Sequence, residues 1–465
     1  MQLEQFDELV SLIYSTEQLV QILACIGLRK LLSREQNPPI QETVDRNLVP
    51  RFLQLAQHED SPKLQFEAIW CLTNIASSES PFVLKMVEHN ATSILLGILD
   101  TAVPLEVKEQ VVWCLGNISG DNVRFRNHII EQGAIRKIAA LVHAAPPNTS
   151  YTRNTSWTLA NFFKGKPSAP FEHLKQCIPT LCKVVMENGN PDILTDICWS
   201  FSYVTDEGGD ERIQIFLEQP NFVPRLLQLM QHEQMVIAVP CLRTLGNILT
   251  ASDQFAQIAI DQGALQLLLS LLDHPKKSIR KEVCWSVSNV TAGNPQQIQQ
   301  CLDIGMLDKV IHMTINADME ERLESVWCVA NAQAQATPEQ VQAMVHKGSL
   351  QALGAIMDSQ EPRPLTVALE GIAFVLKAGC SMSDEGGQNP MVLAVEQCGL
   401  IEKLEQLQFS KNQMIYEKTI SLLDTYFTQD EDADLMSLVM ASAPASSAPA
   451  ASLWGDQSSQ PSFNI

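Results

Sequence analysis

The sequence predicts an all-α protein, a right-handed superhelical solenoid of about ten short helical repeats. Three observations predict this class. A phrase that usually contains Trp recurs at a nearly constant spacing, and a Gly or Asn precedes many copies of it at a similar distance. The composition is rich in Leu, Ala, Gln and Val and holds only 6% aromatic residues. That balance suits packed helices better than strands.

The repeated phrase sets the period of the solenoid. The steps between successive anchor residues are 43, 44, 42, 44, 42 and 42 residues, and a further step of 43 reaches Glu370. This period falls within the roughly 40 to 47 residues of armadillo and HEAT repeats. The anchors are Trp70, Trp113, Trp157, Trp199, Arg243, Trp285 and Trp327.

A turn residue divides each repeat into helices. Gly263, Gly305 and Gly348 each lie 22 residues before an anchor position, and Gly133 and Asn90 lie slightly farther from theirs. Gly, and after it Asn, is the preferred residue for a left-handed helix end. The predicted unit is a short helix, a turn, an apolar helix, a polar loop and a long helix that carries the anchor. Three helices per unit favour armadillo over HEAT repeats.

A single unit cannot bury its apolar face, so neighbouring units must stack into one continuous core with a concave wall. We expect residues 1–50 to form a partial N-terminal repeat and residues 51–398 to form central repeats with a concave peptide-binding groove. Residues 399–429 are expected to form a C-terminal capping repeat. Residues 430–465 are acidic and then rich in Ala, Ser and Pro, a composition typical of a disordered tail.

The charge and the cysteines restrict the function classes. A net charge of −21 repels nucleic acid and anionic membranes and attracts basic partners. The N-terminus has no pattern of a secretion signal, and no apolar run approaches the roughly 18 residues of a membrane span. Several of the twelve Cys flank Trp within helical stretches, which is typical of reduced core thiols in a cytosolic or nuclear protein.

Five of the Trp anchors have an Asn four residues later, on the same helix face. Core packing is the usual role of a single Trp on an apolar helix, but an Asn beside it is costly to bury without a partner. Five such pairs in one register therefore favour a ladder on an exposed face. The pairs are Trp70/Asn74, Trp113/Asn117, Trp157/Asn161, Trp285/Asn289 and Trp327/Asn331.

This ladder has the chemistry to hold an extended basic peptide. Asn side chains can bond the peptide backbone, which fixes its direction without reading its sequence. Indole rings can hold the aliphatic stems and charges of Lys and Arg, at about 0.5 to 2 kcal/mol each. Carboxylates at the ends of these slots would complete the recognition, with Asp121, Asp206, Glu282 and Glu324 as candidates.

Several phrases resemble the importin-α family over about residues 28–430, among them RKLLSREQNPP, LQFEAIWCLTNIAS, VWCLGNISGD, SYVTDEGGDERI and WSVSNVTAG. Even the irregularities of the family recur, since Tyr203 replaces an Asn and Arg243 replaces a Trp. The resemblance implies a nuclear import adaptor, shuttling between cytoplasm and nucleus, that binds cargo proteins bearing monopartite or bipartite basic nuclear localisation signals.

By this resemblance the groove holds two signal sites, which Arg243 would separate by pairing with a carboxylate. Asp121 would recognise the key lysine of the major site. The major site would comprise Trp70, Asn74, Trp113, Asn117, Asp121, Trp157, Asn161 and Trp199. The minor site would comprise Arg243, Asn247, Glu282, Trp285, Asn289, Glu324, Trp327 and Asn331.

Departures from the family concern its partners. The family carries a basic segment upstream of the first repeat that binds importin-β and folds back onto the empty groove, but here no Arg/Lys cluster precedes Arg29. Importin-β coupling and autoinhibition are therefore not implied, and a partial chain and a cargo-sequestering variant both remain open. The C-terminal repeats are compatible with the family's recycling exportin. Ser78 replaces a usual Gly at one edge of the major site, where we expect the geometry of the backbone carbonyls to differ. Glu370 and Phe374 replace an indole and an amide, so we expect a weak end to the minor site.

Two other classes of protein share some features of this sequence. An armadillo scaffold of the catenin kind would have a basic groove for acidic ligands, whereas this chain is acidic. An enzyme would need a phosphate loop, a nucleophile elbow, a zinc-binding His/Glu pair or a dinucleotide turn, and none of these is present. Cys177 and Cys182 are interpreted as buried helix residues and not as metal ligands. We therefore expect no catalysis, no cofactor and no metal.

Overall fold

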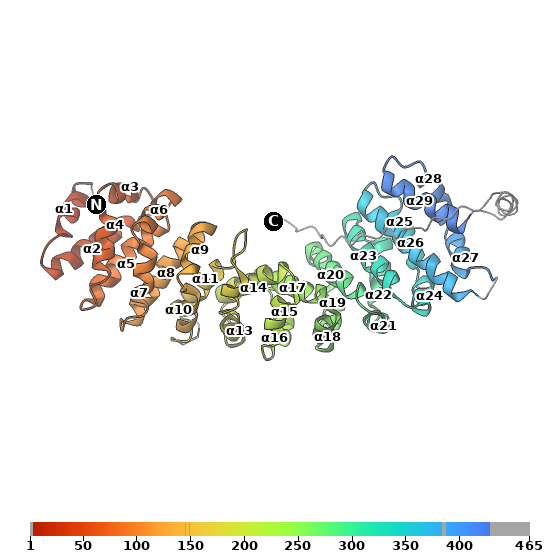
Figure 1. Cartoon of the computed structure of the whole chain (residues 1–465), viewed down its shortest axis with the longest axis horizontal. Helices are drawn as coiled ribbons and strands as arrows, with labels where there is room; N and C mark the ends of the chain where they lie inside the picture. Colours follow the sequence, from red (N-terminus) through yellow and green to blue (C-terminus); the bar gives the residue numbers. More distant parts are fainter. Residues whose placement is uncertain (1–2, 145, 148, 384–386, 428–465) are drawn as a thin grey trace, which may run out of the picture.

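The computed structural model describes residues 3–144, 146–147, 149–383 and 387–427. These residues form 29 helices, and no strand occurs among them. Figure 1 shows the helices following one another along one elongated, curved array from α1 (Leu3–Leu12) to α29 (Gln413–Tyr426). The all-α solenoid predicted from the repeat is confirmed. The predicted disordered tail, residues 430–465, lies outside the described residues.

The helices group into one pair followed by nine triplets, which matches the predicted number of about ten repeats with three helices each. The pair consists of α1 and α2. The short first helices of the triplets are α3 (Ile40–Asp45), α6 (Ser80–Glu88), α9 (Val123–Glu131), α12 (Phe171–Leu174), α15 (Asp210–Leu217), α18 (Asp253–Asp261), α21 (Pro295–Asp303), α24 (Pro338–His346) and α27 (Pro390–Gln397).

The second helices are short and apolar, and α10, α13 and α16 lie along the lower, convex edge in Figure 1. They bury one face each; α16, for example, buries Phe222, Val223 and Leu226. The second helices are α4 (Leu48–Leu55), α7 (Ala91–Ile98), α10 (Ala134–Leu141), α13 (Ile178–Glu187), α16 (Phe222–Leu229), α19 (Ala264–Leu271), α22 (Met306–Asn316), α25 (Ser349–Ile356) and α28 (Leu400–Leu407).

The long third helices pack against one another in succession along the whole array and form its inner layer. Every anchor residue lies on one of them. This layer consists of α2 (Gln18–Leu32) from the initial pair and the third helices α5 (Pro62–Ala76), α8 (Leu105–Asp121), α11 (Ser150–Asn161), α14 (Pro191–Asp206), α17 (Met235–Thr250), α20 (Lys277–Thr291), α23 (Met319–Gln335), α26 (Pro362–Met382) and α29.

The turn before the second helix is left-handed in eight of the nine triplets, because a residue with φ between 55° and 97° reverses the chain there. The predicted turns at Gly133, Gly263, Gly305, Gly348 and Asn90 are confirmed. The fourth triplet differs, with Cys177 at φ −107°. The sequence interpretation missed Asn47 and Asn221, which also adopt the left-handed conformation.

The core is continuous from the first repeat to the last, and cysteines form part of it. All twelve Cys are free thiols and ten of them are buried, including each one that follows or precedes an anchor Trp. Burial raises the pKa of the Cys114 thiol to about 12, so it stays protonated. Cys177 and Cys182 are both buried, as predicted. The interpretation of these cysteines as core thiols is confirmed.

One helix, α26, is long and apolar enough by average hydropathy to cross a membrane. The expectation that no apolar run approaches the length of a membrane span is wrong by the measure of mean hydropathy. The mean hydropathy of α26 is high because its apolar residues outnumber the charged Glu370 and Lys377. Half of the apolar window is buried inside the protein, and α26 packs against α23 and α29. A buried core helix of a solenoid can have the same length and the same mean hydropathy.

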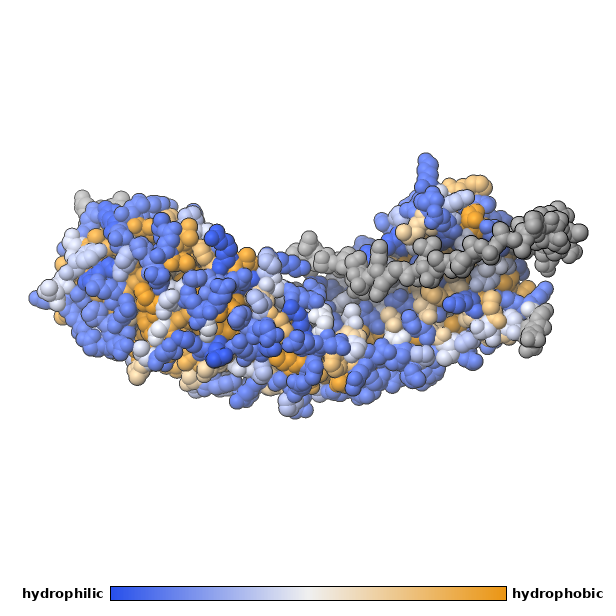
Figure 2. Space-filling view, in the orientation of Figure 1, coloured by the Kyte–Doolittle hydropathy of each residue, from blue (hydrophilic) through white to orange (hydrophobic). Residues whose placement is uncertain are grey.

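The face seen in Figure 2 is mainly hydrophilic, with hydrophobic patches in its N-terminal half.

Candidate peptide-binding groove

The anchor indoles emerge from an otherwise buried helix layer. On α8, Val112, Cys114 and Leu115 are buried, whereas 37% of the surface of Trp113 is exposed. The other anchor Trp residues are half-buried. Their neighbours fill the core, so the indoles line the surface of the inner layer and are not its centre. This placement weakens the alternative that the anchors serve core packing alone.

The Asn side chains of the ladder tie each repeat to the preceding one. Their Nδ2 groups donate to carbonyl oxygens near the end of the previous third helix, so one amide hydrogen is used inside the protein. The bonds run from Asn74 to Arg29 (3.4 Å), from Asn117 to Thr73 (3.1 Å), from Asn161 to Gly116 (3.1 Å), from Asn247 to Ser202 (3.4 Å), from Asn289 to Gly246 (3.1 Å) and from Asn331 to Ser288 (3.1 Å).

The remaining polar atoms of these amides are what a ligand could use. At Asn117, Asn289 and Asn331, the described residues offer no partner for the amide oxygen or the second N–H. Asn161 differs, because its oxygen accepts from Lys164 Nζ at 3.1 Å and its surface is only 4% exposed. Asn247 is 8% exposed and also donates to Thr205 Oγ1 at 2.9 Å. The amides therefore have an internal role, and those of Asn117, Asn289 and Asn331 keep polar atoms that the described residues leave unbonded.

Trp157 and Trp285 each pack closely against a glycine on the preceding third helix. A Cβ added to Gly116 would lie 2.4 Å from Trp157 Cζ3, and one added to Gly246 would lie 2.1 Å from Trp285 Cζ3. Both glycines stand three residues after an anchor, where the other repeats also carry small residues. The sequence interpretation missed this signal, which is readable at Thr73, Gly116, Ala160, Ser202, Gly246, Ser288 and Ala330.

We expect Gly116→Ala to weaken peptide binding about fivefold, because the new methyl group must displace the Trp157 indole. Overpacking typically costs about 1–3 kcal/mol, more than the gain from replacing a helical Gly. Gly97→Ala is the matched control, since no atom lies within 4 Å of its added Cβ on α7. It should raise the free energy of unfolding by about 0.5–1 kcal/mol and leave binding unchanged. Equal binding by both variants would contradict the indole contact.

Arginines of the chain itself lie over three of the anchor indoles. The guanidinium carbon of Arg29 is 4.2 Å from the centroid of the Trp70 ring. The corresponding distances are 6.0 Å from Arg243 to Trp199 and 5.5 Å from Arg363 to Trp327. Within the described ranges, no Lys or Arg covers Trp113, Trp157 or Trp285 in this way.

The predicted carboxylates have different surroundings. Asp121, at the end of α8, accepts from Ser80 Oγ at 2.7 Å and from Asn122 Nδ2 at 2.6 Å. Glu282 pairs with Arg243 at 2.8 Å, which confirms the predicted pairing of that arginine with a carboxylate. Glu282 is therefore partly neutralised before any ligand arrives. Asp206 is exposed at the end of α14.

Glu324, on α23, is half-buried. Burial raises the pKa of its carboxyl above the ordinary value, and the neighbouring charge of Glu282 raises it further. Lys281 and Arg363 act in the opposite direction. A cation brought next to Glu324 would therefore stabilise its charged form.

The anchor row changes character at its C-terminal end. Glu370 occupies the anchor position on α26 and pairs with Lys418 on α29 at 2.8 Å. Phe374, four residues later, is half-buried. This end of the row thus offers an internal ion pair in place of an indole and an amide.

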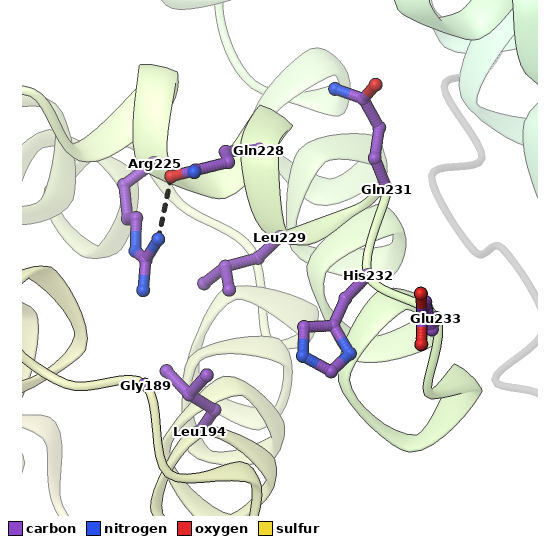
Figure 3. Close-up of a pocket in the computed structure, with 8 residues that line it drawn as sticks. All are labelled: Gly189, Leu194, Arg225, Gln228, Leu229, Gln231, His232 and Glu233. Carbon is purple, nitrogen blue, oxygen red and sulfur yellow. Dashed lines mark hydrogen bonds between the residues drawn. The ribbon is translucent and has the colours of Figure 1, made fainter.

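A pocket of about 440 Å³ lies between α16 and the loop before α14 (Figure 3). Arg225, one of its lining residues, donates to the carbonyls of Val185 (3.1 Å) and Asn188 (2.9 Å) and to Gln228 Oε1 (2.7 Å). The arginine thus joins two repeats. Over the residues that the structure describes, no three His, Cys, Asp or Glu side chains are placed to hold a metal ion.

Comparisons with known proteins agree with this architecture. A family described as the armadillo/beta-catenin-like repeat matches residues 36–77 and 252–292, and one described as the atypical Arm repeat matches residues 389–440. A crystal structure of an engineered protein superposes with a TM-score of 0.75 at 20% identity, over 91% of this chain and 99% of that one. This likeness concerns the fold alone.

Relatives of known name cover nearly the whole chain. Importin subunit alpha-B of Dictyostelium discoideum is 45% identical over 437 residues, 93% of this chain and 84% of that protein. Importin subunit alpha-3 of Arabidopsis thaliana is 40% identical, and importin subunit alpha-1b of Oryza sativa subsp. japonica is 37% identical, each over 92% of this chain and 80% of the relative. With this identity over most of both sequences, the chain belongs to the importin-α family.

Proposed function

We propose that this protein is a nuclear import adaptor that binds the basic localisation signals of cargo proteins, in an extended conformation, along its inner helix layer. The observation that carries the proposal is the set of uncovered indoles at Trp113, Trp157 and Trp285, each followed by an Asn on an acidic chain. Membership of a family of transport adaptors also supports this function over an enzymatic one.

The proposal assigns two stretches of the ladder to two basic clusters. Trp113 and Trp157, with Asn117 and Asp121 beside them, would form the centre of the major site. Trp285 and Asn289 would form the centre of the minor site, with Glu324 as its carboxylate. The other members of the major site are Trp70, Asn74, Asn161 and Trp199, and those of the minor site are Arg243, Asn247, Glu282, Trp327 and Asn331.

The mechanism follows from the chemistry of these groups. The peptide backbone would bond the outward polar atoms of the Asn amides, while Lys and Arg stems lie against the indoles. The long-range acidic field would accelerate encounter with a basic segment. In this proposal, proteins with monopartite signals use the major site and proteins with bipartite signals use both sites.

Transport would also need partners beyond the groove. We propose shuttling between cytoplasm and nucleus, with a recycling exportin contacting the C-terminal repeats around α28 and α29. Importin-β would complete transport through the pore.

The test is direct binding of a labelled lysine-rich signal peptide, followed by fluorescence anisotropy. We expect submicromolar affinity without importin-β, and we expect the affinity to fall by about tenfold or more between low and physiological salt. A peptide in which Glu replaces each Lys is the control and should not bind. If the basic peptide also failed to bind at low salt, the adaptor function would be rejected in favour of a scaffold.

A further inference from the structure

One indole of the minor site already faces a cation of the same chain. Arg363 lies in the first turn of α26, one repeat after Trp327, with its guanidinium carbon 5.5 Å from the centroid of that ring. Its positive charge also acts on the carboxyl group of Glu324, on α23. The arginine is therefore close to both groups that a lysine of the ligand would use at this position.

The face of an indole and a neighbouring carboxylate attract only a limited amount of positive charge. A lysine of a bound peptide must therefore share them with Arg363 or move the arginine aside. Arg363 is exposed, and the described residues provide it with no hydrogen bond and no ion pair that would hold it in place. It can thus be displaced, at a cost in affinity.

The opposite end of the anchor row shows a more firmly filled slot. Arg29 lies 4.2 Å from the centroid of the Trp70 ring, and its Nε is 2.6 Å from Glu67, a carboxylate whose side chain is only 2% exposed. Arg29 is thus held by a buried carboxylate, whereas Arg363 has no such ion pair within the described residues. The comparison indicates that the two end slots differ in how readily a ligand can open them.

We propose that Arg363 is a specificity-determining residue, an internal competitor for the Trp327 indole and Glu324 that weakens the minor site toward short basic peptides. The inference rests on the proposed function and adds a rule for signal choice. A single basic cluster binds at Trp113 and Trp157 of the major site, where no cation from the described residues competes. The minor site is occupied chiefly when a second cluster is delivered on the same bipartite chain, since linkage raises its effective concentration.

The test measures binding of labelled, acetylated hexalysine to the minor site alone, in a Trp113→Ala, Trp157→Ala background of the full chain. We expect Arg363→Ala to raise affinity about threefold to tenfold at low salt, because the competing cation is removed. Arg363→Glu should raise it further, whereas Arg363→Lys should stay near the parent. Arg136→Ala is the matched control, since it removes an equal exposed charge from α10, and it should change affinity less than twofold.

A second measurement avoids the altered background. In the otherwise unchanged chain, the affinity of a bipartite peptide is compared with that of the same peptide with one basic cluster replaced by alanines. Arg363→Ala should increase the advantage of the bipartite peptide about threefold or more. Thermal unfolding of each variant verifies that the exposed substitution leaves the fold intact.

The outcomes separate the two levels of proposal. Unchanged or weaker hexalysine binding by Arg363→Ala overturns the proposed role of this arginine. An equal gain in affinity from Arg136→Ala also overturns it, because the effect would then come from the total charge of the protein. Failure of every basic peptide to bind the unaltered chain rejects the adaptor function itself, and the inference with it.

Discussion

Replacing Trp113 and Trp157 together with alanine should reduce the affinity for a lysine-rich signal peptide about 100-fold. Each indole is expected to contribute roughly 0.5–2 kcal/mol through its contact with a lysine stem and charge. Within the part of the chain that the structure describes, no cation covers either of them, in contrast to Trp70, Trp199 and Trp327. The measurement is fluorescence anisotropy of the labelled peptide at fixed salt concentration.

The same double variant should remain folded, because the indoles lie at the surface of the inner layer. Trp113 is 37% exposed, and the buried residues beside it continue the core without it. Helical circular dichroism should be unchanged, with a small decrease in thermal stability from the lost contact between Trp157 and Gly116. Tyr416→Ala is the control for loss of an exposed aromatic side chain, since this tyrosine is 40% exposed on α29 and should not affect binding.

Loss of helical signal in the double variant would instead show that the two indoles hold the solenoid together. Core packing would then account for the Trp ladder. A folded variant that retains full affinity would place the peptide elsewhere on the surface. Either result would remove the main support for the major site.

The repeat architecture was predictable because the same local signals recur in most of the repeats. A left-handed turn residue has few alternatives, so Gly263 and Gly305 identify their helix boundaries directly from the sequence. Asn47 and Asn221 play the same role but were missed, because Asn also occurs often in loops and helix caps. Periodicity compensates for such gaps, since one missed turn does not shift the neighbouring repeats.

Contacts between repeats were less predictable, because they join residues about one period apart whose facing atoms depend on how the helices pack. The sequence pairs Trp113 with Asn117 but does not reveal that the Asn117 amide donates to the Thr73 carbonyl. It likewise does not reveal that Arg29 and Arg363 cover indoles. The pairing of Arg243 with a carboxylate was expected from the family, and the structure identifies Glu282 as its partner.

The second large effect is expected at Arg126 on α9, which is 1% exposed and has no carboxylate partner among the described ion pairs. Its guanidinium donates to the carbonyls of Lys164, Gly165 (3.1 Å) and Pro167 (2.6 Å) in the loop that follows α11. Replacement by Met would leave these carbonyls without their donor. We expect Arg126→Met to lower the free energy of unfolding by about 3 kcal/mol, measured by urea denaturation.

This loop also reaches the groove, because Lys164 Nζ donates to Asn161 Oδ1 at 3.1 Å. Arg126→Met should therefore weaken peptide binding a few-fold as well, and amide exchange should become faster over residues 162–170. Arg225→Met is the matched control: its guanidinium also bonds two backbone carbonyls, but in the second-helix layer away from the anchor row. It should lower stability without changing peptide affinity. Equal losses of affinity in both variants would mean that stability alone governs binding, and that the loop after α11 has no specific role in shaping the major site.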